Sequence, residues 1–227
     1  PPMVVTVHDV LFEQFPQAYG RHGYHWHRRA LGRVVEQADA LVVPSRPVAK
    51  LLEPRLRPGT RLSVIGHGCD HLASPEPVAA QAALEGLGVT GGFLLSVGTL
   101  EPRKNLATLV EAFSRFRQRY DSAGGCTLLV VGPSGWGRDL RVAADSGVVL
   151  TGRVSDGVLS ELYRRSLALV YVPIGEGFGL PPLEAMSVGT PVVATEVPAL
   201  AEAPEGLYRR VQPDDPDGIA RALAEVC

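Results

Sequence analysis

The second half of this chain alternates short apolar runs with amphipathic segments, and this alternation constrains the fold more than any other feature. From Phe93 onward, apolar runs such as 93–97 and 127–131 are separated by segments like 106–120, whose apolar residues recur at helical spacing. Parallel strands joined by helices produce this βαβα pattern, and such a sheet carries helices on both faces. We therefore predict an α/β fold with a doubly wound parallel sheet of about six strands at 93–97, 127–131, 148–150, 168–172, 190–195 and 207–211.

Local signals predict the helices of this half. Asp156 is expected to cap one helix, and Asp215 followed by Pro216 is typical of an N-cap with proline at the first helical position. Gly and Pro at the ends of the periodic segments mark the remaining boundaries. The expected helices lie at 106–120, after Gly137, at 156–165, at 181–189 and from 216 onward.

The first 72 residues show a shorter version of the same pattern. Strands are expected at 4–7, 40–43 and 62–65, and helices at about 26–37 and from Ser45. So few elements do not cover both faces of a parallel sheet, so we expect this lobe to be incomplete, with opening strands of about 100 residues outside this chain.

The expected domain organisation follows from this comparison of the two halves. Residues 73–92 shift to Pro, Ala and Gly and are predicted to link the lobes. The domains are then 1–72, the carboxyl part of a first lobe, and 93–227, a second lobe.

Charge and cysteine content exclude several classes of protein. The chain has 22 Lys and Arg against 24 Asp and Glu, a formal charge of −2, so no basic footprint for nucleic acid is expected. Its three cysteines form no C-x-x-C pair, which argues against a disulfide framework or a cysteine zinc site and favours the cytoplasm. No apolar run approaches the roughly 20 residues of a spanning helix.

A glycine-rich stretch from Gly175 to Met186 begins where a buried strand is expected to end and finishes inside a helix. Ligands bind at such strand ends in open α/β sheets. Alternate glycines let the backbone approach a ligand closely, and the following helix offers free N–H groups. Glu176 and Glu184 are therefore predicted to line one pocket from different heights.

A second stretch, Gly98 to Asn105, also follows a predicted strand and leads into a helix. Arg103 and Lys104 stand at this helix entrance, where the macrodipole favours acidic side chains. Two cations at that place indicate that an anion such as a diphosphate shares the site.

Together the two stretches resemble the retaining, nucleotide-sugar-dependent glycosyltransferases of the B-type two-lobed fold, specifically glycosyltransferase family 4. Glu176 is followed eight positions later by Glu184 in the family's E-G-F-G-L-P form, and 98–106 looks like its phosphate loop. The turn at 152–156 and the segments around His8 also resemble family segments, so the resemblance covers nearly the whole chain. It implies two Rossmann-like lobes, with 1–72 as the carboxyl part of the N-terminal acceptor-side lobe and 93–227 as the nucleotide-sugar donor-binding lobe.

The resemblance implies roles for the phosphate and ribose contacts. Arg103 and Lys104 would neutralise the donor diphosphate as negative charge builds in the transition state. Glu184 would bind the ribose hydroxyls. The loop backbone around the phosphates would come from Gly98 and Thr99.

It also implies roles around the sugar and the base. Arg153 and Val154 would contact the base, largely through the main chain, and His8 would contact the transferred sugar. Glu176 would hold the sugar hydroxyls together with the residues that follow it in the chain: Gly177, Phe178, Gly179 and Leu180.

The function implied by the resemblance is transfer of a hexose of mannose or glucose type, with retention, from a donor such as GDP-mannose or UDP-glucose to a saccharide or glycolipid. No metal or cofactor is expected. No nucleic acid partner is expected either. The resemblance implies a cytoplasmic enzyme at the inner membrane face, with peripheral membrane contact through the N-terminal part that we expect outside this chain.

Three other interpretations compete with this one. His22, His25 and His27 cluster in a segment expected to be a flexible loop, but their spacing does not suit a zinc site. A dinucleotide-dependent oxidoreductase would need G-x-G-x-x-G, which this glycine spacing does not match. A nucleotide-sugar-binding module without turnover stays open, because one complete Rossmann-like lobe is sufficient to bind a donor.

Overall fold

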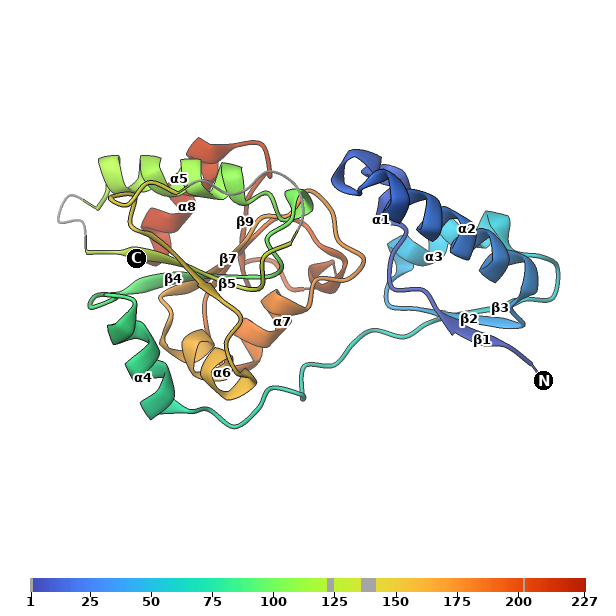
Figure 1. The fold of residues 1–227 in the computed structure, drawn as a ribbon, viewed down its shortest axis with the longest axis horizontal. Coiled ribbons are helices and arrows are strands. Elements are labelled where there is room, and N and C mark those ends of the chain that lie inside the picture. Colours follow the sequence, from blue (N-terminus) through green and yellow to red (C-terminus); the bar gives the residue numbers. More distant parts are fainter. Residues whose placement is uncertain (1, 122–124, 136–141, 202) are drawn as a thin grey trace. The chain divides into compact units, whose positions relative to one another are not determined.

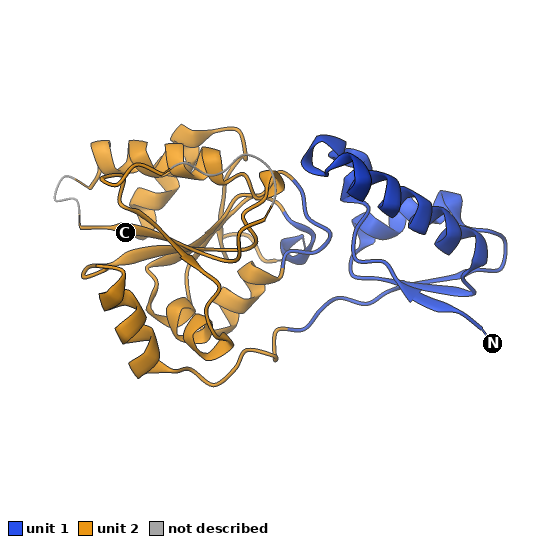
Figure 2. Ribbon diagram, viewed as in Figure 1, with its two compact units in different colours: residues 1–68, 175–179, 197–201 blue, residues 69–174, 180–196, 202–227 orange. Residues whose placement is uncertain are grey.

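The computed structural model describes residues 2–121, 125–135, 142–201 and 203–227. The chain forms two compact units (Figure 2). Unit 1 comprises residues 1–68, 175–179 and 197–201, and unit 2 comprises 69–174, 180–196 and 202–227. Two short loops of the second half therefore belong to the first unit.

Unit 2 contains a parallel sheet of six strands in the order β6-β5-β4-β7-β8-β9 (Figure 1). All of its neighbouring strands pair in parallel, which confirms the predicted fold class and strand number. The strands are β4 (Phe93–Val97), β5 (Thr127–Val131), β6 (Val148–Gly152), β7 (Ala168–Tyr171), β8 (Val192–Ala194) and β9 (Arg209–Arg210).

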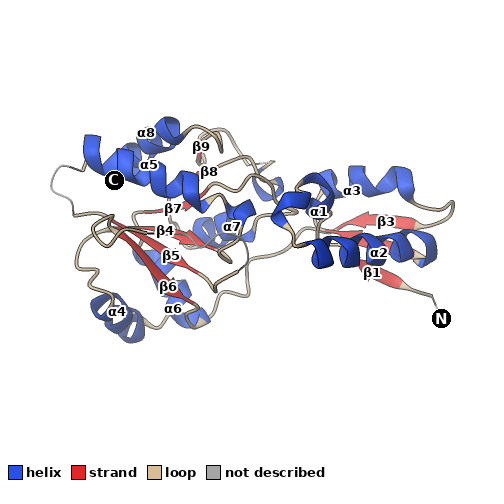
Figure 3. Ribbon diagram, turned by 45° about the horizontal axis from the view of Figure 1, so that its top comes forward, coloured by secondary structure: helices blue, strands red, loops and turns tan. Residues whose placement is uncertain are grey.

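Helices cover both faces of this sheet. In Figures 1 and 3, α5 (Leu106–Arg119) and α8 (Pro216–Val226) lie on one face. The opposite face carries α4 (Pro77–Gly86), α6 (Asp156–Arg165) and α7 (Leu180–Ser187). Because both faces are covered, every residue of β7 is buried and apolar, as expected for a central parallel strand.

An apolar cluster of unit 2 lies between the sheet and the pair α5 and α8. Phe113 of α5 is fully buried in it and stacks on Phe116 with ring centroids 5.9 Å apart. Ile219 and Leu223 contribute from α8, and Leu94 contributes from β4. The helical spacing of the apolar residues thus becomes a continuous buried face.

The predicted N-cap of α8 is confirmed, whereas the predicted N-cap of α6 is wrong. The Asp215 carboxylate accepts a hydrogen bond of 2.8 Å from Gly218 N, and Pro216 opens α8 as predicted. For α6 the cap is Ser155, whose hydroxyl accepts from Val158 N at 3.3 Å. Asp156, predicted as the cap, is the first helical residue instead, where its charge suits the helix dipole.

Other parts of unit 2 differ from the predicted element boundaries. The segment 73–92, expected to be a linker, contains α4, which buries Ala80 and Leu84 and contacts α6. The helix expected after Gly137 falls partly on 136–141, outside the described residues, and no helix forms in 142–147.

Unit 1 contains three parallel strands in the order β1-β2-β3. They are β1 (Val4–Thr6), β2 (Ala40–Val43) and β3 (Arg61–Val64). The helices of this unit are α1 (Leu11–Gln14), α2 (Arg21–Gln37) and α3 (Arg46–Leu52). Its core combines β2 with all three helices.

Short 3-10 turns occur in both units. They lie at Pro16–Ala18, Glu53–Arg55, Pro102–Lys104 and Pro198–Leu200.

Helix α2 begins at Arg21, before the predicted start at Trp26. The three histidines expected in a flexible loop therefore lie on this helix, because Leu31 and the apolar residues around it pack onto the core and stabilise the preceding turns. None of the helices in the described ranges is both long and apolar enough to cross a bilayer.

Candidate functional site

The order of the strands in unit 2 reverses between β4 and β7. The chain runs outward from β4 to β5 and β6, then returns to the other side of β4 with β7 and continues through β8 and β9. Loops that leave these two neighbouring strands diverge, and the crevice between them is the usual ligand site of an open α/β sheet. The predicted phosphate loop follows β4, and the segment leading to α7 follows β7.

Close backbone approach shapes the loop after β4. Gly98 has a φ of 150°, and a Cβ atom added to it would lie 3.2 Å from Cε of Lys104. Gly132, which follows β5, has a φ of 154°, and its added Cβ would lie only 2.0 Å from the Gly98 carbonyl oxygen. Only glycine therefore fits at Gly132, and the lysine side chain lies directly against the loop.

Replacing Gly132 with alanine is expected to displace the Gly98 loop and to lower the free energy of unfolding by about 1–3 kcal/mol, the usual cost of overpacking. Chemical denaturation measures this loss. Gly189→Ala is the matched control, because Gly189 also has a positive φ, 83°, but no atom lies within 4 Å of its added Cβ. An equal loss in both variants would show that backbone strain, and not the Gly98 contact, is responsible.

The two predicted cations lie in the 3-10 turn that precedes α5. Lys104 Nζ donates a hydrogen bond of 3.0 Å to the Tyr171 hydroxyl at the end of β7. Arg103 donates to the buried carboxylate of Glu101 at 2.5 Å, and its carbonyl accepts from Ile174 N at 3.0 Å. Both cations are thus held where the loops after β4 and β7 meet.

Asn105 connects these loops, a role that the sequence analysis did not predict. It has a left-handed backbone with φ 58°, and its Nδ2 donates to Val172 O at 3.1 Å and to Pro213 O at 2.7 Å. Asparagine tolerates this conformation better than most residues. Its position directly after the Arg-Lys pair and before a helix is the only signal that the sequence offers.

Glu184 lies inside α7 and is only 8% exposed. Tyr163 Oη donates a hydrogen bond of 2.6 Å to Glu184 Oε2, and His71 Nε2 lies 2.8 Å from Oε1. Burial, together with the adjacent carboxylate of Glu184, raises the pKa of Tyr163, so its phenol stays protonated and remains a donor. Sequence spacing alone revealed neither partner of this carboxylate.

The other residues of unit 2 that are predicted to bind the ligand lie at the carboxyl edge of the sheet, as Gly98 does. Arg153 and Val154 follow β6 directly, and Leu180 is the first residue of α7. Since the strands are parallel, their carboxyl ends share one edge. Unit 2 therefore collects these predicted residues along its carboxyl edge: Gly98, Thr99, Arg103, Lys104, Arg153, Val154, Leu180 and Glu184.

The glycine-rich loop that carries Glu176 belongs to unit 1, where it contacts segments that follow each of the three strands. A Cβ on Gly177 would lie 2.3 Å from the carbonyl oxygen of His8, after β1. Ser45 Oγ, after β2, donates to Gly177 O at 2.7 Å. The Phe178 ring meets the His67 ring, after β3, edge-on at 5.1 Å.

His8 lies just beyond β1, as predicted, and is exposed. Its ring stacks on that of His67 with centroids 5.5 Å apart and an interplanar angle of 24°. Glu176, in the glycine-rich loop of the same unit, is partly exposed. His67 was not predicted as a site residue, although it lies in a His-Gly pair after a strand.

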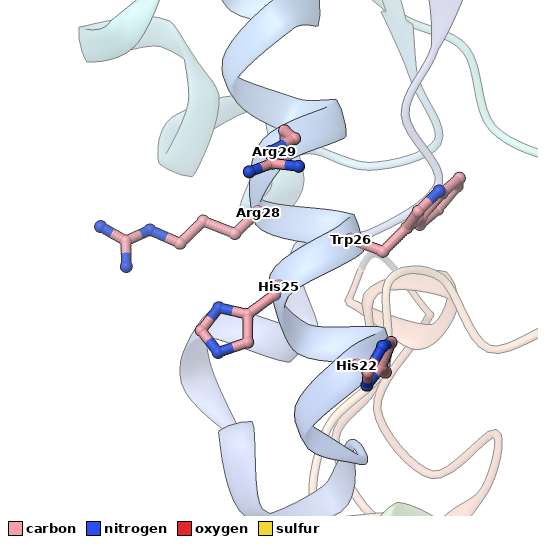
Figure 4. Close-up of a pocket in the computed structure, with 5 residues that line it drawn as sticks. All are labelled: His22, His25, Trp26, Arg28 and Arg29. Atoms are coloured by element: carbon pink, nitrogen blue, oxygen red, sulfur yellow. The ribbon is translucent and has the colours of Figure 1, made fainter.

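A hollow of about 610 Å³ lies along α2 and is lined by His22, His25, Trp26, Arg28 and Arg29 (Figure 4). Figure 4 shows the His25 and Trp26 side chains on opposite sides of the helix. The third histidine, His27, instead stacks on Phe12 at 5.4 Å. In the part of the chain that the structure describes, no group of three His, Cys, Asp or Glu residues is arranged to hold a metal ion.

Two cysteines that are distant in sequence share a cavity of about 400 Å³ in unit 2. Cys126, directly before β5, and Cys227, directly after α8, both line it. The neighbouring thiol of Cys227 and burial raise the pKa of Cys126. All three cysteines are free thiols.

Two family descriptions match this chain. Residues 91–227 match "Glycosyl transferases group 1", and residues 1–71 match "Glycosyltransferase Family 4". Similar curated proteins include the O-antigen chain mannosyltransferase B of Escherichia coli, 28% identical over 235 residues. The D-inositol 3-phosphate glycosyltransferase of Salinispora arenicola is 33% identical over 251 residues.

The alignments to these two relatives cover 98% and 99% of this chain, respectively, but only 60% and 55% of the relatives. Among solved structures, sucrose-phosphate synthase from Thermosynechococcus elongatus is similar with a TM-score of 0.72 and 25% identity, over 98% of this chain and 58% of that one. Anabaena HepE in complex with UDP-glucose is similar with a TM-score of 0.73 and 20% identity, over 100% of this chain and 62% of that one.

Proposed function

This chain belongs to the glycosyl transferases group 1, with the B-type two-lobed fold, and we propose that it transfers a hexose from a nucleoside-diphosphate sugar to a saccharide or glycolipid acceptor, with retention of anomeric configuration. One observation carries the proposal. The strand order reverses between β4 and β7. Arg103 and Lys104 lie in the loop after β4, and the buried Glu184 lies in α7, the helix that follows β7.

Each of these groups has a role in the proposed reaction. Arg103 and Lys104 stabilise the negative charge that develops on the departing diphosphate, so the transfer uses the chain's own cations and no metal or cofactor. Glu184 accepts hydrogen bonds from the ribose hydroxyls. Arg153 and Val154 contact the base, through main-chain groups that follow β6.

The sugar contacts are assigned to unit 1. Glu176 and the backbone groups of Gly177, Phe178 and Gly179 hold the sugar hydroxyls, and His8 contacts the transferred sugar. The Ser45 hydrogen bond to Gly177 O, which is buried, supports this assignment because it fixes the loop that carries Glu176.

Mannose is the favoured sugar and GDP-mannose the favoured donor. Several similar curated proteins are named as mannosyltransferases of O-antigen chains, among them those of Escherichia coli and Salmonella typhimurium. A saccharide or glycolipid precursor at the inner membrane face is the corresponding acceptor. UDP-glucose is the second donor to be tested.

Thermal unfolding with a panel of nucleotide sugars tests the donor assignment. A ligand that binds only the folded protein at 100 times its Kd stabilises it by about 2.7 kcal/mol. We expect GDP-mannose or UDP-glucose to raise the melting temperature and NAD to leave it unchanged. Stabilisation without sugar transfer in the full-length enzyme would favour a nucleotide-sugar-binding module, and no stabilisation by any nucleotide sugar would contradict both functions.

Glu184→Gln is expected to weaken nucleoside diphosphate binding about 10-fold, because one charged acceptor for the ribose is lost. Isothermal titration calorimetry measures the change in Kd. Glu85→Gln on the exposed surface of α4 is the matched control and should bind like the wild type. Equal affinity in Glu184→Gln and the control would remove Glu184 from the proposed site.

A further inference from the structure

Tyr163 is a fully buried residue of α6 whose hydroxyl reaches an acid on the next helix. Its Oη donates to Glu184 Oε2 at 2.6 Å, a short hydrogen bond to a charged acceptor. Hydrogen bonds to ionised groups are shorter and stronger than neutral ones. This contact therefore fixes one oxygen of the Glu184 carboxylate.

The backbone of Tyr163 is fixed as well. Its carbonyl oxygen accepts from Thr190 Oγ1 at 2.6 Å and from Ser166 Oγ at 2.9 Å. Thr190 follows the carboxyl end of α7, so α6 and α7 are joined at both the acid and the helix end. The donor hydroxyl and the carboxylate consequently share one rigid framework.

The two oxygens of Glu184 have different surroundings. Oε2 faces the buried Tyr163, whereas Oε1 contacts His71, whose side chain is 55% exposed. Oε1 therefore lies on the side of the exposed His71 ring. A carboxylate oxygen accepts more than one hydrogen bond, so Oε1 is the oxygen that we assign to a ligand. Rotation of the carboxylate would break the Tyr163 contact inside the protein, where an unpaired charged oxygen is costly.

We propose that Tyr163 is a positioning residue, which holds Glu184 so that Oε1 faces the ribose of the bound nucleotide. The inference rests on the proposed function, because it assumes that Glu184 contacts the ribose. Tyr163 lies outside the glycine-rich stretch, and in this proposal its hydroxyl sets the affinity of the site for the ribose hydroxyls. A hydroxyl that served only the stability of the fold would have no such selectivity.

The test compares two ligands on two variants. Tyr163→Phe keeps the ring and removes the hydroxyl, and Ser166→Ala removes a hydroxyl that touches the same residue but not Glu184. Calorimetry with GDP and UDP, each beside its 2′,3′-dideoxy counterpart, measures the contribution of the ribose hydroxyls. Melting temperatures of all variants identify any unfolded fraction.

We expect Tyr163→Phe to bind the ribose ligand about 3- to 10-fold more weakly, a range typical of coupling between hydrogen-bonded neighbours, and to bind the dideoxy ligand like the wild type. Ser166→Ala should bind both ligands like the wild type. A Tyr163→Phe variant that weakens both ligands equally, or neither, overturns the inference.

Glu184→Gln separates this failure from failure of the proposed function. If Glu184→Gln reduces the preference for ribose over dideoxyribose while Tyr163→Phe does not, Glu184 contacts the ribose without help from Tyr163 and only the positioning role is lost. If Glu184→Gln leaves the preference unchanged, the ribose assignment itself is wrong, and the inference falls with it.

Discussion

Replacing Arg103 and Lys104 together with alanine is expected to weaken nucleoside diphosphate binding by about 100-fold or more. Each charge-assisted hydrogen bond to a phosphate contributes roughly 1.5–3 kcal/mol, and 1.4 kcal/mol corresponds to a tenfold change in Kd. The loss should exceed that of Glu184→Gln, since the proposed function places two cations against the diphosphate, the most highly charged part of the ligand. Titration calorimetry with GDP and UDP measures it.

The control for this double variant must remove two positive charges at a position away from the proposed site. Arg164→Ala with Arg165→Ala removes two exposed cations from the last turn of α6 and should leave the affinity unchanged. Arg103 also pairs with Glu101, which is 8% exposed, so the melting temperature of each variant has to be measured beside its affinity. Similar affinity losses in both double variants would show that the loss comes from the change in net charge and not from the position of Arg103 and Lys104.

Phe113→Ala is expected to lower the free energy of unfolding by about 3–5 kcal/mol, the usual cost of truncating a buried aromatic residue. Phe113 of α5 is fully buried in the apolar cluster under α5 and α8, so removal of its ring leaves a cavity there. Denaturation by guanidinium chloride, followed by circular dichroism, measures the loss.

Tyr120→Ala is the comparison for this core variant. The Tyr120 ring also stacks on Phe116, at 6.4 Å, but it is 48% exposed, so its removal leaves little cavity and should cost much less. A loss below about 1 kcal/mol for Phe113→Ala would mean that the cluster between α5 and α8 contributes little to the stability of unit 2.

The strands in the centre of unit 2 follow closely from local sequence. β4 and β5 have the predicted bounds, because central parallel strands are continuous apolar runs bounded by turn residues. The edge strand β9 covers only two residues, where five were predicted. An edge strand pairs with a neighbour on one side only, so fewer backbone hydrogen bonds hold its ends.

The segments that were predicted wrongly have weak or conflicting local signals. Residues 73–92 contain Pro and Gly, yet α4 forms within them because Ala80 and Leu84 bury against the rest of unit 2. The early start of α2 has a similar cause, since its glycine and aromatic residues are poor helix formers in isolation. Tertiary burial outweighs such propensities in both cases.

The candidate site shows the same division between local pattern and fold. Glycines, paired cations and the two glutamates could be selected from the sequence, because close backbone approach and anion binding require particular residue types at strand ends. The partners of Glu184 could not, since Tyr163 and His71 lie 21 and 113 positions away from it, and Ser45 lies 132 positions from Gly177. Periodicity and turn chemistry act over a few residues, whereas hydrogen bonds between distant segments exist only after the chain has folded and excluded water around them.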